Sequence, residues 1–276
     1  MSTNFDRLTV NTIRTLVADA VQKANSGHPG LAIGAAPMAL SVFKQMRHNP
    51  ANPSWRGRDR FVLSAGHASM LEYSLLHLFG YDVSIDDIKN FRQLGSKTAG
   101  HPEYGNIAGI EATTGPLGQG FAMAVGMAMA GKLDEAAGKA SGRVYALLGD
   151  GELQEGLIWE AAMAAAHYKL DNLCAIVDWN GLQIDGKNED VMTVAPIDEK
   201  FQAFGFHTIS IDGHDFGQIF AAFDAARACK GKPTVIIAKT HKGRGVSFME
   251  DQAGWHGKAP NEEEAKQAVA ELGGEW

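Results

Sequence analysis

Two side chains that could bind a hard metal cation stand at the ends of two apolar segments. Asp150 follows "RVYALLG", and Asn180 follows "LCAIVDW". Both segments predict buried strands of a parallel sheet, and such sheets bind ligands beyond the carboxyl ends of their strands. Carboxylate and amide oxygens suit Mg²⁺ or Ca²⁺, with further ligands from carbonyls, water and phosphates. In the structural alternative, Asp150 caps a helix and Asn180 begins an Asn-Gly turn.

Glycines on both sides of Asp150, in "GDGELQEG", favour a diphosphate as the ligand. Gly149 and Gly151 allow the backbone to turn sharply and approach a diphosphate, and a helix predicted to begin near Glu155 directs its first amides there. Glu152 is interpreted as a solvated first-turn charge. A nicotinamide cofactor is disfavoured, because "GPLGQG" lacks the first G-x-G of that fingerprint and Asp150 would repel a diphosphate without a metal.

Four of the ten histidines lie in glycine-flanked loops: His28, His67, His101 and His256. Each alone is typical of a structural loop residue. Together they suit a polar pocket for hydroxyls, a carbonyl or a phosphate, with proton transfer near neutral pH. Their spacing is not that of zinc ligands. His214, in "DGHD", is interpreted as structural.

Two carboxylates, Glu155 and Glu160, stand near the start of the same predicted helix. One interpretation is a pair of exposed acids favoured by the helix dipole. The other is a buried pair that relays charge across an interface. The spacing alone leaves both open.

The elements that must position these residues alternate along the chain. We expect strands at 60–66, 143–150, 173–180, 207–213 and 234–240. We expect helices at 8–24, 67–80, 84–94, 155–169, 198–204, 216–229 and within 261–276, and a glycine-rich turn leading into a helix at 115–133. This order predicts one α/β domain, a parallel sheet with helices on both faces, over residues 1–276.

Composition excludes several classes of function. The net charge is −7, without a Lys/Arg run, which argues against nucleic acid as a partner. No run of about 18 apolar residues predicts a membrane span, and "MSTNFDRLTV" lacks the pattern of a signal peptide. Two cysteines, Cys174 and Cys229, are expected to be small buried side chains without a disulfide. The cytoplasm is therefore the expected location.

Gly149–Gly151 followed by Asn180 resembles the thiamine-diphosphate motif. The segments "SGHPG", "NPSWRGRDRFVLSAGHASMLEYSLLHLFGY", "NFRQLGSKTAGHPE" and "TTGPLGQG" narrow the resemblance to the transketolase family, from about Leu8 to His256. The resemblance implies the thiamine-diphosphate-binding fold, with thiamine diphosphate and Mg²⁺ (or Ca²⁺) as cofactors. The reaction implied is transfer of a two-carbon ketol unit from a ketose phosphate to an aldose phosphate.

The resemblance also implies a role for each site residue. Asp150, Asn180 and the backbone carbonyl of Leu182 would bind the metal. The residues lining the cofactor would be His67, Gly115, Pro116, Leu117, Gly149, Asp150, Gly151, Glu155 and Asn180. His28, His101 and His256 would face the sugar; Glu155 would meet a glutamate of a partner, and Glu160 would extend a carboxylate link between active sites. Two departures from the family pattern are "AGWHG" around His256 and "SGHPGLAIG" after His28.

The resemblance covers only the first third to half of a full-length transketolase, the diphosphate-binding domain. We expect no pyrimidine-binding domain in this chain, and the resemblance then implies the N-terminal subunit of a split enzyme. A C-terminal subunit would complete the site in an α2β2 heterotetramer, and this chain alone would be inactive. The alternatives among enzymes are a transketolase-like enzyme for an unusual sugar phosphate and an enzyme like deoxyxylulose-phosphate synthase. The alternative from another class is a non-catalytic cofactor-binding module.

Overall fold

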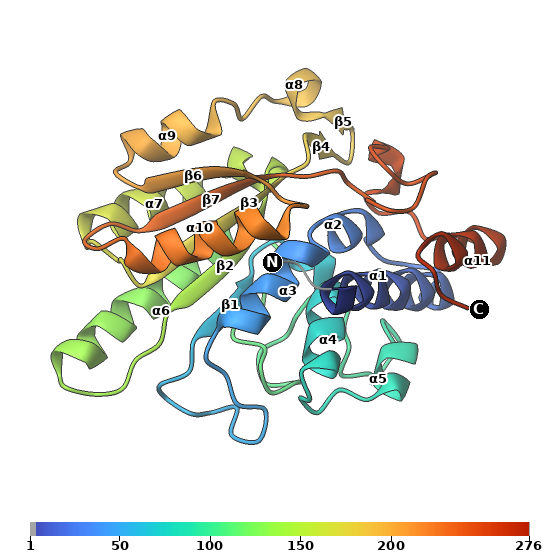
Figure 1. Ribbon diagram of the computed structural model, residues 1–276, viewed down its shortest axis with the longest axis horizontal. Coiled ribbons are helices and arrows are strands. Elements are labelled where there is room, and N and C mark those ends of the chain that lie inside the picture. Colours follow the sequence, from blue (N-terminus) through green and yellow to red (C-terminus); the bar gives the residue numbers. More distant parts are fainter. Residues whose placement is uncertain (1–3, 276) are drawn as a thin grey trace.

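A five-stranded parallel sheet forms the centre of the computed structural model, which describes residues 4–275 (Figure 1). Its strand order is β1-β2-β3-β7-β6, and every neighbouring pair is parallel. The strands are β1 (Arg60–Leu63), β2 (Val144–Gly149), β3 (Leu173–Trp179), β6 (His207–Asp212) and β7 (Thr234–Lys239). The α/β class predicted from the sequence is confirmed, and β2 and β3 are neighbours as their ligand site requires.

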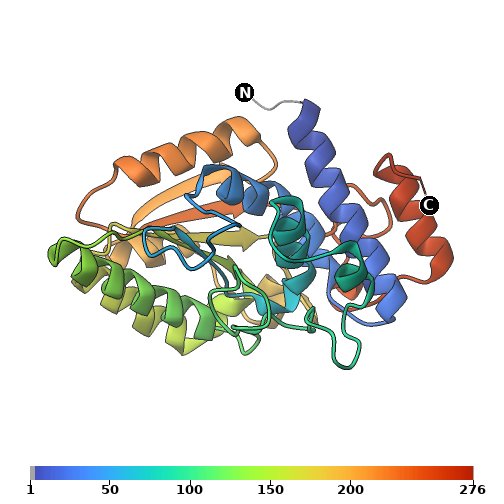
Figure 2. The same cartoon turned by 90° about the horizontal axis from the view of Figure 1, so that it is seen from below.

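Helices cover both faces of the sheet, because alternate residues of each strand point to opposite sides. On β2, Tyr145 and Leu147 pack into one core, whereas Val144, Ala146 and Leu148 pack into the other. The first core contains residues of α1 (Asn4–Ala24), α3 (Ala36–Gln45), α4 (Ser69–Leu78) and α10 (Phe216–Ala228). The second contains residues of α6 (Gln119–Ala136), α7 (Gly156–His167) and α9 (Ile197–Ala203), on the opposite side of the sheet (Figure 2).

Several short elements were not predicted. The segment after His28 forms α2 (Pro29–Gly34), which is buried along its whole length. Pro29 occupies the first turn, where its missing N–H costs no hydrogen bond. Between β3 and α9 lie the hairpin β4 (Leu182–Gln183) and β5 (Gly186–Lys187) and the helix α8 (Asn188–Val191). The last helix, α11, spans Glu262–Glu271.

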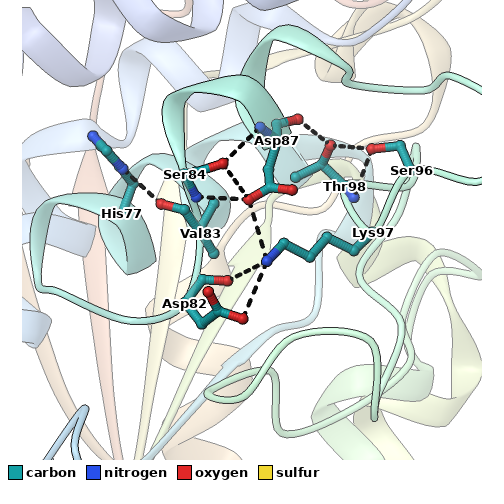
Figure 3. A network of polar contacts seen from close by, with 8 residues as sticks. All are labelled: His77, Asp82, Val83, Ser84, Asp87, Ser96, Lys97 and Thr98. Atoms are coloured by element: carbon teal, nitrogen blue, oxygen red, sulfur yellow. Dashed lines mark hydrogen bonds and ion pairs between the residues drawn. The ribbon is translucent and has the colours of Figure 1, made fainter.

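The helix predicted over 84–94 is shorter, because α5 covers only Ile85–Lys89. The irregular segment that follows is held by a polar network (Figure 3). Lys97 forms ion pairs with Asp82 and Asp87, and the Thr98 hydroxyl donates a hydrogen bond to the carbonyl of Asp87 at 2.7 Å. The network fixes the chain as it returns toward His101.

Candidate functional site

A cavity of about 300 Å³ lies at the carboxyl ends of β2 and β3. Of the residues predicted for the site, those that line it are His28, His67, Gly115, Leu117, Gly149, Asp150, Gly151, Glu155, Asn180, Leu182 and His256. Pro116 is exposed and does not line it. His101 does not line it, and the centre of its ring lies 6.2 Å from that of His28. Glu160 is exposed elsewhere on α7. The sequence therefore predicts most of the lining.

Asp150 is buried at the end of β2, with 2% of its surface exposed. Its carboxylate accepts hydrogen bonds from the backbone N–H groups of Gly151 at 2.8 Å and Gly181 at 2.5 Å. Burial raises the pKa of this carboxyl, and the two N–H groups and the nearby Lys242 oppose that rise. The bond to Gly181 joins the end of β2 to the turn that follows β3.

Asn180 begins a turn at the end of β3. Its side-chain oxygen accepts a hydrogen bond from the Leu182 N–H at 3.0 Å, and its amide donates to Asp178 at 2.6 Å. Asp178 is fully buried and accepts a second bond from the Thr240 hydroxyl at 2.5 Å. The Asn-Gly turn expected as a structural alternative is therefore present, and it holds Asn180 in the cavity wall.

Lys242 is a site residue that the sequence reasoning missed. Its side chain is 1% exposed. Its ammonium donates hydrogen bonds to the carbonyl of Leu182 at 2.8 Å and to Nδ1 of His256 at 3.0 Å. Burial lowers the pKa of Lys242, whereas the nearby Asp150 and Asp178 raise it. The sequence feature that could have indicated this residue is a lysine shortly after the end of β7, the strand beside β3.

The donor set of this cavity fits a divalent cation bound with a diphosphate. Asp150 and Asn180 supply carboxylate and amide oxygens, and the Leu182 carbonyl, which accepts from Lys242, lies beside them. These are oxygen ligands of the kind Mg²⁺ and Ca²⁺ prefer. The Lys242 ammonium adds a positive charge for phosphate oxygens. His67 has a buried Nε2 without a partner among the described residues, as expected for a group that meets a ligand.

Glu152 corrects an expectation from the sequence. It is not a solvated charge: only 2% of its surface is exposed. Residues Gly151–Gln154 form a 3₁₀ turn that directs the carboxylate inward. There it accepts hydrogen bonds from the Ser64 hydroxyl and from the N–H groups of Gly118 at 2.8 Å and Gly149 at 3.2 Å. Glu152 therefore ties the 115–118 turn to the end of β2, and burial raises its pKa to about 6.

Replacing Glu152 by glutamine is expected to destabilise the fold. The carboxylate of Glu152 now accepts hydrogen bonds from two N–H groups. The NH₂ group of glutamine would face one of them, and two donors would then oppose each other. A buried donor left without an acceptor costs about 1–3 kcal/mol, so urea unfolding should show a loss of that size. Glu263→Gln, at an exposed position of α11, is the matched control and should change stability by less than about 0.5 kcal/mol. An equal loss in both variants would contradict the bracing role of Glu152.

Three histidine rings converge in the lining of the cavity. The His28 ring centre lies 5.3 Å from His67 and 5.6 Å from His256, and His67 stacks on His256 at 4.9 Å. Arg92 donates to Nδ1 of His28 at 3.2 Å, and Lys242 donates to Nδ1 of His256. Because Nδ1 accepts in both rings, the neutral imidazoles carry their protons on Nε2. Those N–H groups can bind sugar hydroxyls.

Burial holds these rings in the neutral form. It is the largest cause that lowers the pKa of His28 to about 4 and that of His256 to about 3, and neighbouring cations add to the effect. The pKa of His67 lies well below its usual value for the same reason, and that of His101 is lowered by burial and Arg92. At neutral pH the cavity therefore presents neutral imidazoles around the Lys242 ammonium.

His256→Gln is expected to reduce the loss of stability in acid. The unfolded chain binds a proton at this residue near pH 6.5, but the folded chain does so only near pH 3. The stability present above pH 6.5 is therefore lost as pH falls, at no more than about 1.4 kcal/mol per pH unit for one histidine. Urea unfolding of native protein and variant at pH 7, 6 and 5 measures the difference. If the stabilities of native protein and variant changed in parallel with pH, the lowered pKa of His256 would be contradicted. Glu152 contributes the opposite pH dependence to both proteins, so the difference between them at each pH removes its contribution.

Gly115 shows why the adjoining loop needs a glycine. Its φ is +150°, and an added Cβ would lie 3.1 Å from Cδ2 of His101. The loop therefore packs its backbone directly against the His101 ring. This contact fixes one side of the turn that lines the cavity.

Glu155 and Glu160 both lie on the surface of the described chain. Glu155 is the N-cap residue of α7 and lines the cavity mouth. Their predicted role across an interface stays a prediction.

Comparisons with known proteins agree with this geometry. The model of the family described as transketolase, thiamine diphosphate binding domain, matches residues 5–275. Transketolase of Geobacillus stearothermophilus is 50% identical over 274 residues, which cover 96% of this chain and 41% of that protein. Transketolase of Bacillus subtilis is 48% identical over 270 residues, covering 95% of this chain and 40% of that protein. The chain thus spans about two fifths of the length of these curated relatives.

Solved structures give the same result. Transketolase from Campylobacter jejuni superposes with a TM-score of 0.95 at 45% identity, covering 100% of this chain and 44% of that chain. A Pichia stipitis transketolase in complex with sedoheptulose-7-phosphate superposes with a TM-score of 0.94 at 43% identity, covering 99% of this chain and 41% of that one. The fold and site thus define an α/β domain that binds a diphosphate cofactor. The chain belongs to the transketolase family of thiamine diphosphate binding domains.

Proposed function

We propose that this chain is the diphosphate-binding subunit of a two-subunit transketolase. It would transfer a two-carbon ketol unit from a ketose phosphate to an aldose phosphate, with thiamine diphosphate and Mg²⁺. The observation that carries the proposal is one cavity that combines the oxygen donors at the ends of β2 and β3 with three neutral histidines. Membership of the family supports it. The alternative enzymes are a transketolase-like enzyme for an unusual sugar phosphate and one like deoxyxylulose-phosphate synthase.

Asp150, Asn180 and the Leu182 carbonyl would hold the metal, and Ca²⁺ would suit the same oxygens. To serve the metal, the Leu182 carbonyl must share or release its bond with Lys242, whose charge would then be available to the diphosphate. Gly149 and Gly151 leave the backbone beside Asp150 free of side chains. The bound cofactor would supply an electron sink. The protein would bind and orient the substrate and move protons.

The histidines would handle the sugar. The neutral rings of His28 and His256 carry protons on Nε2, which suits hydrogen bonds to hydroxyl and carbonyl oxygens. His67 would meet the cofactor through its unpartnered Nε2. His101 would act with His28, whose ring lies 6.2 Å away. Proton transfer at a sugar hydroxyl needs a base in its neutral form, which the lowered pKa values provide.

A C-terminal subunit with a pyrimidine-binding domain would complete the site in an α2β2 assembly. The share of the relatives' length that this chain spans, about two fifths, supports the need for a further component. At the cavity mouth, Leu117 is 37% exposed and Ile184 is 67% exposed, so apolar side chains stand where a second protein surface would cover the ligand. Glu155 also lines this cavity, where it would meet the partner's glutamate. Glu160 would extend a carboxylate link between active sites.

We place the enzyme in the cytoplasm. Cys174 and Cys229 are both free, as is usual in a reducing compartment. Cys174 is buried as expected, whereas Cys229 is only partly buried. Over the part of the chain that the structure describes, no helix is long and apolar enough to cross a bilayer.

Tagged chain recovered from its native host tests the proposal. The eluate is analysed for partners and assayed for transfer from xylulose 5-phosphate to ribose 5-phosphate, with and without thiamine diphosphate and Mg²⁺. Cofactor-dependent transfer together with a partner subunit is the expected result. A partner without transfer on these sugars would redirect the search to other ketose phosphates. Recovery of a lone, inactive chain would favour the non-catalytic binding module.

A further inference from the structure

A second polar cavity is lined in part by Arg244, two residues after Lys242 of the cofactor cavity. Its volume is about 620 Å³, and it shares no lining residue with the cofactor cavity. Helix α1, the start of α10 and the loop after β7 form its walls. The residues that matter for its chemistry are Arg7, Asn11, Arg14, His214, Asp215 and Arg244.

Arg14 is a buried charge without a counter-ion. It is 8% exposed, and its guanidinium donates to the carbonyl of Ile33 at 3.1 Å and to the side-chain oxygen of Asn11 at 3.3 Å. Among residues 4–275, no carboxylate lies within ion-pair distance of it. Glu250, the acid that favours its charge, is paired with Arg244. Buried charges in proteins are normally paired, so this guanidinium lacks an expected anion.

His214 supplies a second donor without an acceptor. Its Nε2 accepts a hydrogen bond from the backbone N–H of His241 at 2.9 Å. Burial and the neighbouring arginines lower the pKa of His214 to about 4, so the ring is neutral. A neutral ring that accepts at Nε2 carries its proton on Nδ1. That Nδ1 is buried and has no partner in the described part of the chain.

The acids of this cavity are engaged by neighbouring N–H groups. Asp215 caps α10 by accepting from the N–H groups of Gly217 at 2.7 Å and Gln218 at 3.3 Å. Asp212 accepts from the N–H of His214 at 2.8 Å. Neither is paired with Arg14. Arg7 stands on the same face of α1, two turns before Arg14, and is exposed at the rim.

We propose that this second cavity binds a phosphate-class anion, with Arg14 and His214 as its buried donors and Arg7 at its entrance. A guanidinium offers several N–H donors in one plane, which suits the oxygens of a tetrahedral phosphate. The anion is free inorganic phosphate or the phosphate group of a monoester, because both present the same oxygens. The inference does not depend on the proposed transketolase activity, since none of these residues lines the cofactor cavity.

Calorimetric titration of the full chain with inorganic phosphate tests the proposal. Saturable binding is expected, and Arg14→Gln should weaken it at least about tenfold, as for a lost hydrogen bond to a charged group. Arg7→Ala, an exposed change that leaves the core intact, should weaken it by a smaller factor even if the Arg14 variant fails to fold. Arg56→Ala, an exposed arginine outside the cavity, should leave it unchanged.

Two further readouts make the outcome specific. Phosphate should shift the Nδ1 resonance of His214 in a nitrogen-15 spectrum of the imidazoles. Ribose 5-phosphate that competes with phosphate would identify the monoester as the ligand, and failure to compete would identify free phosphate. The proposal is overturned if no saturable binding is found. It is also overturned if Arg14→Gln and Arg7→Ala both bind phosphate as native protein does, because the phosphate would then lie outside this second cavity.

Discussion

An Asp150→Asn variant is expected to lose Mg²⁺-dependent binding of thiamine diphosphate while it stays folded, with a loss of stability of about 1–3 kcal/mol because its amide must face one of two buried N–H groups. Asparagine matches aspartate in size, and its oxygen can still accept one of the N–H groups of Gly151 and Gly181. It lacks the negative charge that a metal requires beside a diphosphate. We expect the affinity of the assembled enzyme for the cofactor to fall at least about 100-fold, more than the loss usual for a residue that only supports a ligand.

Titration with the cofactor in Mg²⁺ and in a chelator measures this effect. Native protein should bind much more weakly in the chelator, and the Asp150→Asn variant should show the same weak affinity in both conditions. Asp190→Asn, at an exposed position of α8 outside the cavity, is the matched control. Unchanged affinity in Asp150→Asn would remove the metal assignment.

Lys242→Met is expected both to weaken diphosphate binding and to destabilise the protein without ligand. Methionine fills much of the volume of the lysine stem but leaves Asp150 and Asp178 without the nearby cation that favours their charged forms. Removing one partner of a buried charged group typically costs about 3–5 kcal/mol. Because burial raises the pKa of both carboxyls, protonation relieves part of this cost. The deficit should therefore be larger at pH 8 than at pH 5.

Two measurements check the Lys242 variant. Chemical denaturation at the two pH values gives the stability, and Lys232→Met, at an exposed position, should match native protein. Titration with thiamine diphosphate and with unphosphorylated thiamine separates the charge effect. The variant should lose affinity for the diphosphate and little for thiamine. Equal losses for both ligands would show that Lys242 supports the fold of the cavity rather than the diphosphate.

The sequence predicts the strand ends well, for a physical reason. Strands of a parallel sheet that are buried on both faces are continuous apolar segments, so β2 and β3 are visible without tertiary information. Asp150 and Asn180 directly follow them, and the topology places both at one edge of the sheet. The glycine-flanked histidines were predicted from local sequence alone, and three of the four line the cavity.

The residues that were missed depend on tertiary contacts. Glu152 lies in an acidic, glycine-rich segment typical of an exposed turn, and only the loop at Gly118 and the Ser64 hydroxyl bury it. Lys242 lies in "THKGRG", a pattern typical of an exposed basic turn. In the structure its ammonium is buried and donates hydrogen bonds to Leu182 and His256. Hydrogen-bond partners that are distant in sequence decide the burial of such residues, and no local pattern encodes them.

Helix α2 was missed for a related reason. "PGLAIG" contains two glycines and a proline, which predict a turn. The segment is nevertheless helical and packs closely on its neighbours: an added Cβ on Gly30 would lie 2.9 Å from the carbonyl oxygen of Trp255, and one on Gly34 would lie 2.8 Å from that of His241. The glycines therefore serve helix packing beside the cavity.

The central claim is that this chain supplies the diphosphate half of a transketolase site. It is tested most directly by omission from a mixture of four purified components: this chain, its partner subunit, thiamine diphosphate and Mg²⁺. Transfer from xylulose 5-phosphate to ribose 5-phosphate is followed as each component is left out. The account predicts transfer with all four and none when any one is missing. Full transfer by the partner subunit without this chain, or by the mixture without thiamine diphosphate, would contradict it.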